Sequence, residues 1–269
     1  MALTATYDPV LSRIRLSADL LGATATRCVF WRTTNGFVSY DTVRGGWPVT
    51  VNSQNASLDD YEWTPGVATT YRVQSYTAAN LTAVATYDVT ITQDLTSVWL
   101  KVPAAPYLNT PVQVLDRSEV TRRSRAGVFD VVGRSRPVMV GDVASSRSYT
   151  VQLLTESATE ESNLDYLFAS GEVVFVQLPS TVSYIPGGYF SVGDTASVPF
   201  DKGGDVAPLR RWSVPLTEVA APGPAVIGPV YTWTSVLNDY PTWTALLAAN
   251  ATWSDLLQRT STPSDVIVP

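Results

Sequence analysis

The chain has 269 residues, a formal net charge of −6 and a pI near 4.7. This length is enough for two domains that each bury a core, and a net acidic chain with only 18 lysines and arginines is not expected to bind nucleic acid, because neutralising phosphates requires a basic surface. Charged residues make up only 16% of the chain, which favours a surface covered by neighbouring subunits or a low-charge extracellular β-protein.

The residue inventory argues against a reaction site. The chain has no histidine, which removes Ser–His and Cys–His dyads and most zinc sites. Its single cysteine, Cys28, precedes Val29 and Phe30, and this context predicts a thiol packed in a core strand. We therefore expect no catalytic residue, no metal site and no cofactor. We also expect synthesis in the cytoplasm and no membrane insertion, because there is no signal-peptide pattern and no run of ~20 apolar residues.

Residues 1–95 are predicted to form a small antiparallel β-sandwich. Short alternating segments separated by turns fill this region, and Asn35-Gly36 is a strong signal for a two-residue hairpin turn. Residues 62–76 resemble the E-to-F region of a fibronectin type III domain, in which a strand of the pattern Tyr-x-[Val/Ile]-x-[Ala/Ser]-Tyr supplies core tyrosines. Tyr71 and Tyr76 occupy those positions here.

Residues 96–221 are predicted to form a second β-sandwich with one flanking helix at 158–170. Ser157 lies three residues before Glu160 in a capping-box pattern, and Gly171 is placed to end the helix. The segments before and after the helix have the composition of strands. Residues 127–132 and 137–140 predict two further strands, and Pro215 predicts an edge or a bulge in the last strand, at 210–219. The closely spaced prolines of residues 103–111 predict an extended arm or a sheet-edge segment.

Four arginines follow that proline-rich segment, with few acidic residues nearby in the sequence. Two interpretations are open: a solvated loop, or a subunit interface held by arginine forks on carboxylates of a neighbour. The arginines are Arg117, Arg122, Arg123 and Arg125.

A separate cluster of carboxylates is better explained as a solvated helix face than as a glycosidase-like acid pair. That cluster consists of Glu156, Glu160, Glu161 and Asp165.

Residues 222–269 contain a proline-rich linker and three ten-residue Thr-Trp repeats. Each threonine is a predicted N-cap, and Trp233, Trp243 and Trp253 precede aliphatic residues by three and four positions, so we predict one short helical turn per repeat. The tryptophans are then expected to dock on another subunit or, alternatively, to cap their own second domain.

Residues 125–220 resemble the minor tail proteins of long-tailed phages infecting actinobacteria. The resemblance is carried by Arg-x-Gly-Val-Phe-Asp-Val-Val-Gly-Arg, by Ser146-Arg-Ser-Tyr-Thr-Val, by the acidic helix ending Leu-Phe-Ala-Ser-Gly, and by Arg210-Arg-Trp-Ser-Val-Pro-Leu-Thr-Glu-Val. The trailing Thr-Trp repeats resemble the C-terminal tail of the same proteins.

This resemblance implies a non-enzymatic structural protein of the virion. The expected fold is that of tail-tube and tail-hub proteins, and the expected assembly is a hexameric ring of distal tail type at the tip of the tail. The implied partners are further copies of the chain, the tail tube protein and other tail-tip proteins. Nucleic acid is expected only to pass through the lumen of the ring. The alternative function is a carbohydrate- or receptor-binding adsorption protein of the tail, with Trp47, Trp63 or Tyr76 stacking on sugar.

Overall fold

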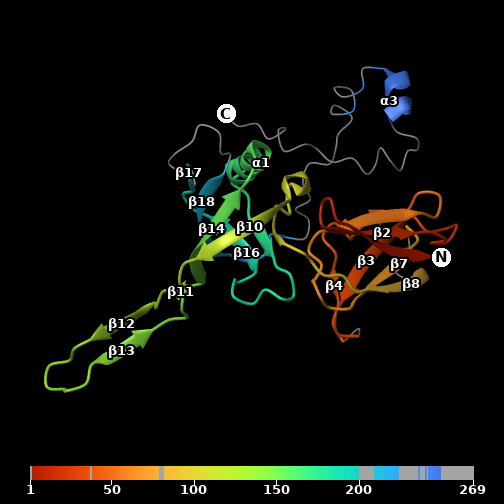
Figure 1. The fold of residues 1–269 in the computed structure, drawn as a ribbon. Helices are drawn as coiled ribbons and strands as arrows, with labels where there is room; N and C mark the ends of the chain where they lie inside the picture. The colour runs from red at the N-terminus through yellow and green to blue at the C-terminus, as the bar shows by residue number, and fades with distance from the viewer. Residues whose placement is uncertain are drawn as a thin grey trace.

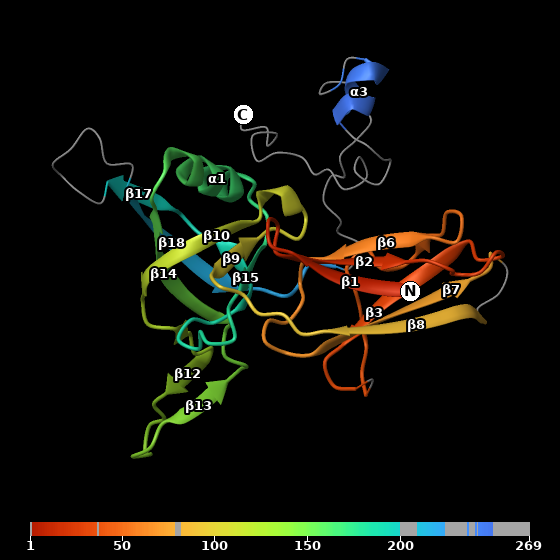
Figure 2. The same cartoon turned by 45° about the vertical axis from the view of Figure 1, so that its right-hand side comes forward.

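The computed structural model describes residues 2–36, 38–78, 82–199, 209–223 and 242–249, together with residues 236 and 240. The protein is mainly β (Figure 1), and the described residues up to 223 form two units that lie side by side in Figures 1 and 2. The buried side chains form one hydrophobic core within residues 3–99 and another within residues 98–216. Trp99 belongs to the first core although its strand belongs to the second unit.

The first unit consists of two antiparallel sheets that face each other across one core. The alternation predicted from the sequence is clearest at residues 69–76, where buried side chains alternate with partly exposed ones and Tyr71 and Val73 are fully buried. Asn35-Gly36 does not form the predicted two-residue hairpin, because the flanking strands end at Thr33 and restart at Asp41. One sheet contains β1 (Leu3–Asp8), β2 (Arg13–Ala18) and β6 (Ala56–Asp60); the other contains β3 (Arg27–Thr33), β4 (Asp41–Thr42), β5 (Val49–Thr50), β7 (Thr69–Tyr76) and β8 (Ala83–Ile91).

The second unit differs from the predicted sandwich, because its strands form one sheet that closes on itself. The order β14-β10-β9-β15-β16-β18 returns to β14 through a ladder that runs from Ser148↔Thr217 to Thr155↔Arg210. Closure leaves these six antiparallel strands without a free edge, and we call this unit the barrel. Its strands are β9 (Val98–Lys101), β10 (Thr110–Arg117), β11 (Thr121–Arg122), β14 (Arg147–Thr155), β15 (Val174–Gln177), β16 (Gly188–Val192), β17 (Ala196–Pro199) and β18 (Arg210–Glu218).

Strand β18 closes the barrel because it is long enough to pair with different strands along its two edges. One edge pairs with β14, while the other pairs with β16 near Leu216 and with β17 near Trp212. Pro215 lies between those two ladders, where Gly193 N donates to its carbonyl oxygen at 2.8 Å. Pro215 therefore lies opposite the gap between β16 and β17, while β18 itself pairs with β14 without a register shift and is not an edge strand, so the edge or bulge predicted for this strand is absent from that ladder.

The predicted helix is present as α1 (Ala158–Ala169). The Ser157 side chain accepts a hydrogen bond from Glu160 N at 3.2 Å, and the glycine that follows the helix, Gly171, has φ +65°. Leu164 and Leu167 are buried in the barrel core. Local capping and one apolar face are thus sufficient to place this helix against the barrel.

The proline-rich segment at residues 103–111 is not an extended arm, and that prediction is wrong. Pro106 begins a short 3-10 helix, η1 (Pro106–Leu108). Proline suits this position, because the first residue of a helix has no partner within the helix for a backbone N–H. Asn109 Oδ1 accepts from Val102 N at 3.0 Å, and most side chains of the segment are buried. Pro111 lies in β10, which pairs with β9 on one edge and with β14 on the other.

A long β-ribbon leaves the barrel between β11 and β14. Its outer part is the hairpin of β12 (Ala126–Phe129) and β13 (Val138–Gly141), which form the two strands predicted near these positions. Backbone hydrogen bonds from Ser145 N to Arg123 O (3.0 Å) and from Asp142 N to Arg125 O (3.2 Å) join this hairpin to its base. Figures 1 and 2 show the ribbon extending away from the barrel, and we call residues 121–146 the arm.

The middle Thr-Trp repeat contains α3 (Trp243–Ala249). Thr242 Oγ1 accepts from Ala245 N at 3.2 Å, so this threonine caps the helix as predicted, and Leu246 is buried beside Val236. Trp233 and Trp253 lie outside the described residues, as does most of the segment at 222–269. No helix within the described residues is long and apolar enough to cross a membrane.

Candidate functional site

The described residues hold no group of three or more histidine, cysteine, aspartate or glutamate side chains arranged to bind a metal ion. The only thiol is in β3: Cys28 is fully buried, and burial raises its pKa to about 12. A neutral, inaccessible thiol is a poor nucleophile. The surfaces of the molecule are therefore more informative than its titratable groups, and three of them stand out beside one buried network.

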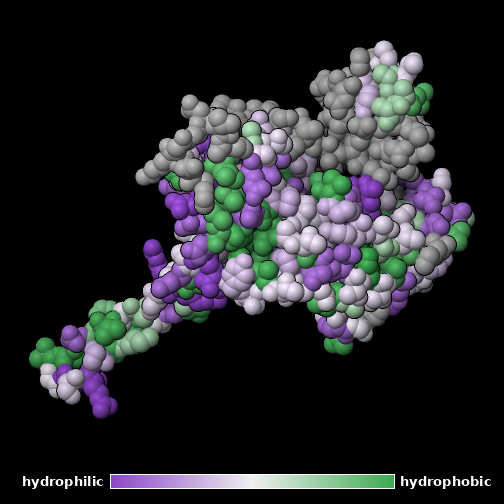
Figure 3. Space-filling view, in the orientation of Figure 1, coloured by the Kyte–Doolittle hydropathy of each residue, from purple (hydrophilic) through white to green (hydrophobic). Residues whose placement is uncertain are grey.

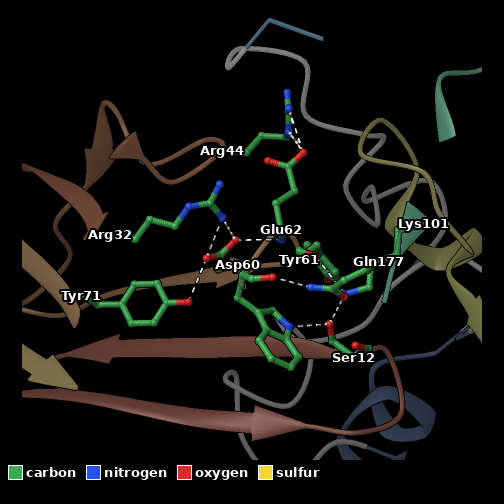
Figure 4. A network of polar contacts seen from close by, with 10 residues as sticks. Ser12, Arg32, Arg44, Asp60, Tyr61, Glu62, Tyr71, Lys101 and Gln177 are labelled. Carbon is green, nitrogen blue, oxygen red and sulfur yellow. Dashed lines mark hydrogen bonds and ion pairs between the residues drawn. The ribbon is translucent and has the colours of Figure 1, made fainter. Parts of the chain in front are cut away.

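The buried network joins the two units (Figure 4). Lys101 on β9 donates from Nζ to the carbonyl oxygen of Tyr61 at 2.8 Å and to that of Ser12. The amide of Gln177 on β15 donates to the carbonyl oxygen of Trp63, and the indole of Trp63 donates to Ser12 O at 3.0 Å. We call these five residues the joint. Because they connect the barrel to the sandwich through buried hydrogen bonds, they fix how the two units are oriented.

Burial changes the acid–base behaviour of the joint. Lys101 is only 1% exposed, and desolvation lowers its pKa to about 7, although the charges of Asp60 and Glu62 oppose the shift. Its ammonium group also lies over the rings of Trp63 and Trp99, 5.8 and 5.9 Å from their centroids. The proton on Lys101 is therefore held by carbonyl oxygens and aromatic faces rather than by a direct carboxylate contact.

Asp60 holds in place the segment of the sandwich that contains Tyr61 and Trp63 of the joint. Its carboxylate accepts from Arg32 at 2.8 and 3.0 Å, from the Tyr71 hydroxyl at 2.9 Å and from Glu62 N at 2.9 Å. Asp60 is 1% exposed, and burial raises the pKa of Tyr71. Glu62 in turn accepts from Arg44 at 2.9 Å, while Arg44 donates to the carbonyl oxygen of Gly223 at 2.6 Å. The chain that follows β18 is thus tied back to the sandwich.

The first surface is an aromatic patch on the outer side of the sheet that contains β3 and β7. Trp47 is 43% exposed and packs edge-on against Tyr76 at 5.8 Å, with the Arg27 guanidinium 5.3 Å from the indole centroid. Beside them, Trp31 contacts Tyr40 at 5.9 Å. A hollow of about 330 Å³ is lined by Val29, Trp31, Thr42, Trp47 and Tyr76, and we call this group the aromatic patch.

The structure separates the three aromatics proposed from the sequence to stack on sugar. Trp47 and Tyr76 lie together in the aromatic patch, whereas Trp63 is 2% exposed and belongs to the joint. Trp63 is therefore excluded as a binding residue. Trp31 was missed, because three buried residues precede it in β3 and the strand lacks the alternation that would show which way its ring points.

The second surface is the arm, and the four arginines proposed as an interface lie at its base. Arg117 donates to the carbonyl oxygens of Tyr184 and of Ser118, the latter at 3.0 Å. Arg122 and Arg123 are exposed, and Arg125, which is 62% exposed, lies 3.9 Å from the equally exposed Asp142. Three of the four guanidinium groups thus face solvent in a single chain, which does not favour an interface over a solvated loop. The interface itself remains a prediction.

The outer part of the arm presents exposed hydrophobic side chains that belong to neither hydrophobic core. Figure 3 shows hydrophobic residues along the arm and at its tip, interspersed with hydrophilic ones. Val132 is 102% exposed and Val143 is 80% exposed. The large hydrophobic residues exposed on the arm are Val128, Phe129, Val131, Val132, Val138, Met139, Val140 and Val143. The signal in the sequence was a pair of strands without polar alternation, a pattern typical of strands covered on both faces.

The third surface is a groove of about 420 Å³ on the barrel beside α1. Val112 and Leu154 contribute apolar lining, and Glu156 and Glu160 add two carboxylates where β14 leads into α1. Gln113, exposed on β10, also lines it.

Trp243 is the one tryptophan of the predicted interface that lies within the described residues. It lies on α3 and is 64% exposed.

A scan against protein-family models and a search of curated proteins both find no match to this chain.

Proposed function

We propose that this protein is a structural component of the tail tip of a long-tailed phage, where copies of the chain form a ring that joins the tail tube to the tip. The proposal begins with the resemblance of residues 125–220 to minor tail proteins of phages infecting actinobacteria. In this proposal the ring is of distal tail type and hexameric, the partners are the tail tube protein and other tail-tip proteins, and the chain performs no catalysis.

The observation that carries the proposal is the division of the molecule into an ordered body and an outward arm. A closed barrel with one flanking helix is joined to a second sandwich through the buried joint, and the arm extends from the barrel with its hydrophobic residues exposed. A subunit of a ring requires both features: a body of fixed shape and a surface that is completed by its neighbour.

The strand order of the first unit supports a fibronectin type III-like assignment. Three strands (β1-β2-β6) face a sheet in the order β4-β3-β7-β8, and the hydroxyl of Tyr71 is bonded to Asp60, which lies just before the turn that precedes β7. In this assignment the sandwich decorates or extends the ring, while the barrel provides the ring wall.

The test of the proposed function uses intact particles. Mass spectrometry of purified virions should detect this chain in several copies per particle, and antibodies against the sandwich should label the end of the tail farthest from the capsid. Absence of the chain from purified virions, or label confined to the capsid, would refute the proposal. Labelling along the whole tube would instead indicate a tube subunit.

The aromatic patch favours a second candidate function, carbohydrate binding during adsorption. Trp47 and Tyr76 line a hollow, and Trp47 also lies close to Arg27, an arrangement in which a sugar ring could stack while a guanidinium bonds its hydroxyls. Binding of the purified protein to host cell-wall polysaccharide should fall at least tenfold in Trp47→Ala. Tyr184→Ala, which removes a 56% exposed ring from the barrel, is the matched control and should bind normally. Equal binding by both variants would exclude the patch.

A further inference from the structure

The arm contributes little to the fold of its own chain. Its outer strands pair only with each other, and a two-stranded hairpin is marginally stable in water without a covering layer. Phe129, Met139 and Val140 are 58%, 67% and 63% exposed, which leaves the hairpin uncovered on the described chain. Exposed hydrophobic residues gathered on one hairpin in this way favour a protein–protein contact.

The charge of the arm restricts its partner. Residues 121–146 contain five arginines and two aspartates, a formal charge of +3, whereas the whole chain carries −6, so the remaining residues carry −9. Two arms would repel each other, which disfavours a symmetric contact between arms. The body of a second copy, in contrast, attracts the arm electrostatically.

The groove on the barrel of the second copy is a surface that matches the arm. Its apolar lining includes Val112 and Leu154, and Glu156 and Glu160 supply carboxylates for arginines such as Arg134 and Arg136 of the outer arm.

The positions of the outer arm and of the groove's carboxylates disfavour a contact between them within one chain. The arm leaves β14 near Arg147, whereas the carboxylates of the groove lie beyond Thr155, at the other end of the same strand. Nine residues of strand separate these ends by roughly 27 Å. Figures 1 and 2 show α1 and the arm at opposite ends of the barrel. An arm that points away from its own groove is placed to fill the groove of another copy.

We propose that the arm of one copy docks in the groove beside α1 of a second copy, so that the chains associate head to tail. Such a contact uses two different surfaces, and repetition of it gives a closed ring or an open filament. The inference deepens the proposed function, because it names the two surfaces through which copies of the chain would form the ring, but it is tested on the purified chain without the virion. Failure of the virion test above and failure of self-association below are therefore distinguishable.

The first experiment replaces the arm in the full chain. Thr121 pairs with Ser148 and Arg122 with Arg147, so a two-residue Asn-Gly turn in place of residues 124–145 continues the same register. Sedimentation equilibrium over a wide concentration range should show association of the wild-type chain and only monomer for the variant. The variant's circular dichroism and Tm show whether the body is intact. A wild-type chain that stays monomeric, or a variant that associates as tightly as wild type, would overturn the proposal.

The second experiment tests the groove and the head-to-tail geometry. Gln113→Lys/Glu156→Lys changes two exposed positions of the groove and leaves the arm intact. We expect this variant to associate at least tenfold more weakly than wild type, as should Arg134→Glu/Arg136→Glu. Asp41→Lys, at an exposed site on β4 of the sandwich and outside both surfaces, is the charge-change control and should associate normally.

Mixing then separates the possible modes of association. The arm-replaced variant retains a groove and the groove variant retains an arm, so an equimolar mixture should form a 1:1 dimer that grows no further. If arms paired with arms, the groove variant would associate by itself and no heterodimer would form in the mixture. Native mass spectrometry resolves the two species, because the variants differ in mass by about 20 residues.

Discussion

The joint and the arm place polar and apolar side chains in opposite ways. In the joint, charged and polar side chains such as Lys101 and Gln177 are buried and bonded to carbonyl oxygens of the same chain. In the arm, hydrophobic side chains such as Phe129 and Met139 are exposed and contact no core. The difference teaches which surfaces the chain completes by itself and which it leaves for a partner: buried hydrogen bonds stabilise the fold, whereas exposed apolar strands gain stability only on association.

The largest effect on stability is expected at Asp60, which lies next to Tyr61 of the joint and is itself buried. Asp60→Ala removes the carboxylate that Arg32 and Tyr71 share and leaves a largely buried guanidinium without its partner. We expect the free energy of unfolding of the sandwich to fall by about 3–5 kcal/mol. Chemical denaturation followed by tryptophan fluorescence measures it. Asp88→Ala breaks the exposed pair with Arg72 and should cost less than about 1 kcal/mol. Equal losses would contradict the importance assigned to burial.

The protonation of Lys101 gives the next largest effect. Because the pKa of Lys101 is about 7 in the folded chain and 10.5 in the unfolded chain, the unfolded chain binds more protons between these values. Stability should therefore rise with pH from about 7 towards 10.5, by up to about 2 kcal/mol between pH 7 and pH 9. Lys101→Met lacks this proton and should show a flatter profile. Parallel profiles for the two proteins would show that Lys101 does not titrate in this range.

A smaller pH effect is expected at the barrel closure. Arg147 on β14 forms two side-chain hydrogen bonds with Glu218 on β18 and lowers the pKa of that carboxyl to about 2. The stabilisation is complete above the unfolded pKa near 4.5 and is lost as the pH falls through about 2. Both side chains are about one-third exposed, so solvent screening limits the effect to about 1 kcal/mol. Glu218→Gln lacks this stabilisation at every pH. Its free energy of unfolding should therefore be lower than that of the wild type at neutral pH and should vary less as the pH falls in an acid titration. A profile identical to that of the wild type would refute the role of the pair.

The smallest effect on folding is expected from the arm. Replacing residues 124–145 with Asn-Gly removes all of the large exposed hydrophobic residues of the arm but no residue of either core. The free energy of unfolding of the monomer should change by no more than about 0.5 kcal/mol, because the substitution lies outside every buried contact. Chemical denaturation at low protein concentration provides the value. A loss comparable to that of Asp60→Ala would show that the arm belongs to the fold of its own chain.

Local features of the sequence were sufficient to predict part of the fold. The capping residue Ser157 and the terminating Gly171 define α1 to within one residue, and alternation identifies β7 because one of its faces is buried. These signals reside within a few positions along the chain. The same holds for Thr242, whose side chain caps α3.

The remaining features depend on contacts that are distant in the sequence. Barrel closure follows from the pairing of β14 with β18, and no local pattern distinguishes it from a sandwich of two sheets. Lys101 resembles an ordinary strand residue until Tyr61, 40 positions away, supplies its carbonyl partner. The two strands of the arm were predicted, but their projection was not, because a hairpin has the same sequence pattern inside a sheet and outside it.

Hydrogen–deuterium exchange of the wild-type chain at several protein concentrations tests the central claim most directly, namely that the joint is completed within one chain and the arm by a second copy. At concentrations where the chain is monomeric, amides of residues 121–146 should exchange fast while those of β9 and β15 exchange slowly. As the chain associates, the arm and the segment at residues 156–160 of the groove should become protected together, and the joint should not change. Slow exchange of the arm in the monomer, or association without protection of the arm, would contradict the account.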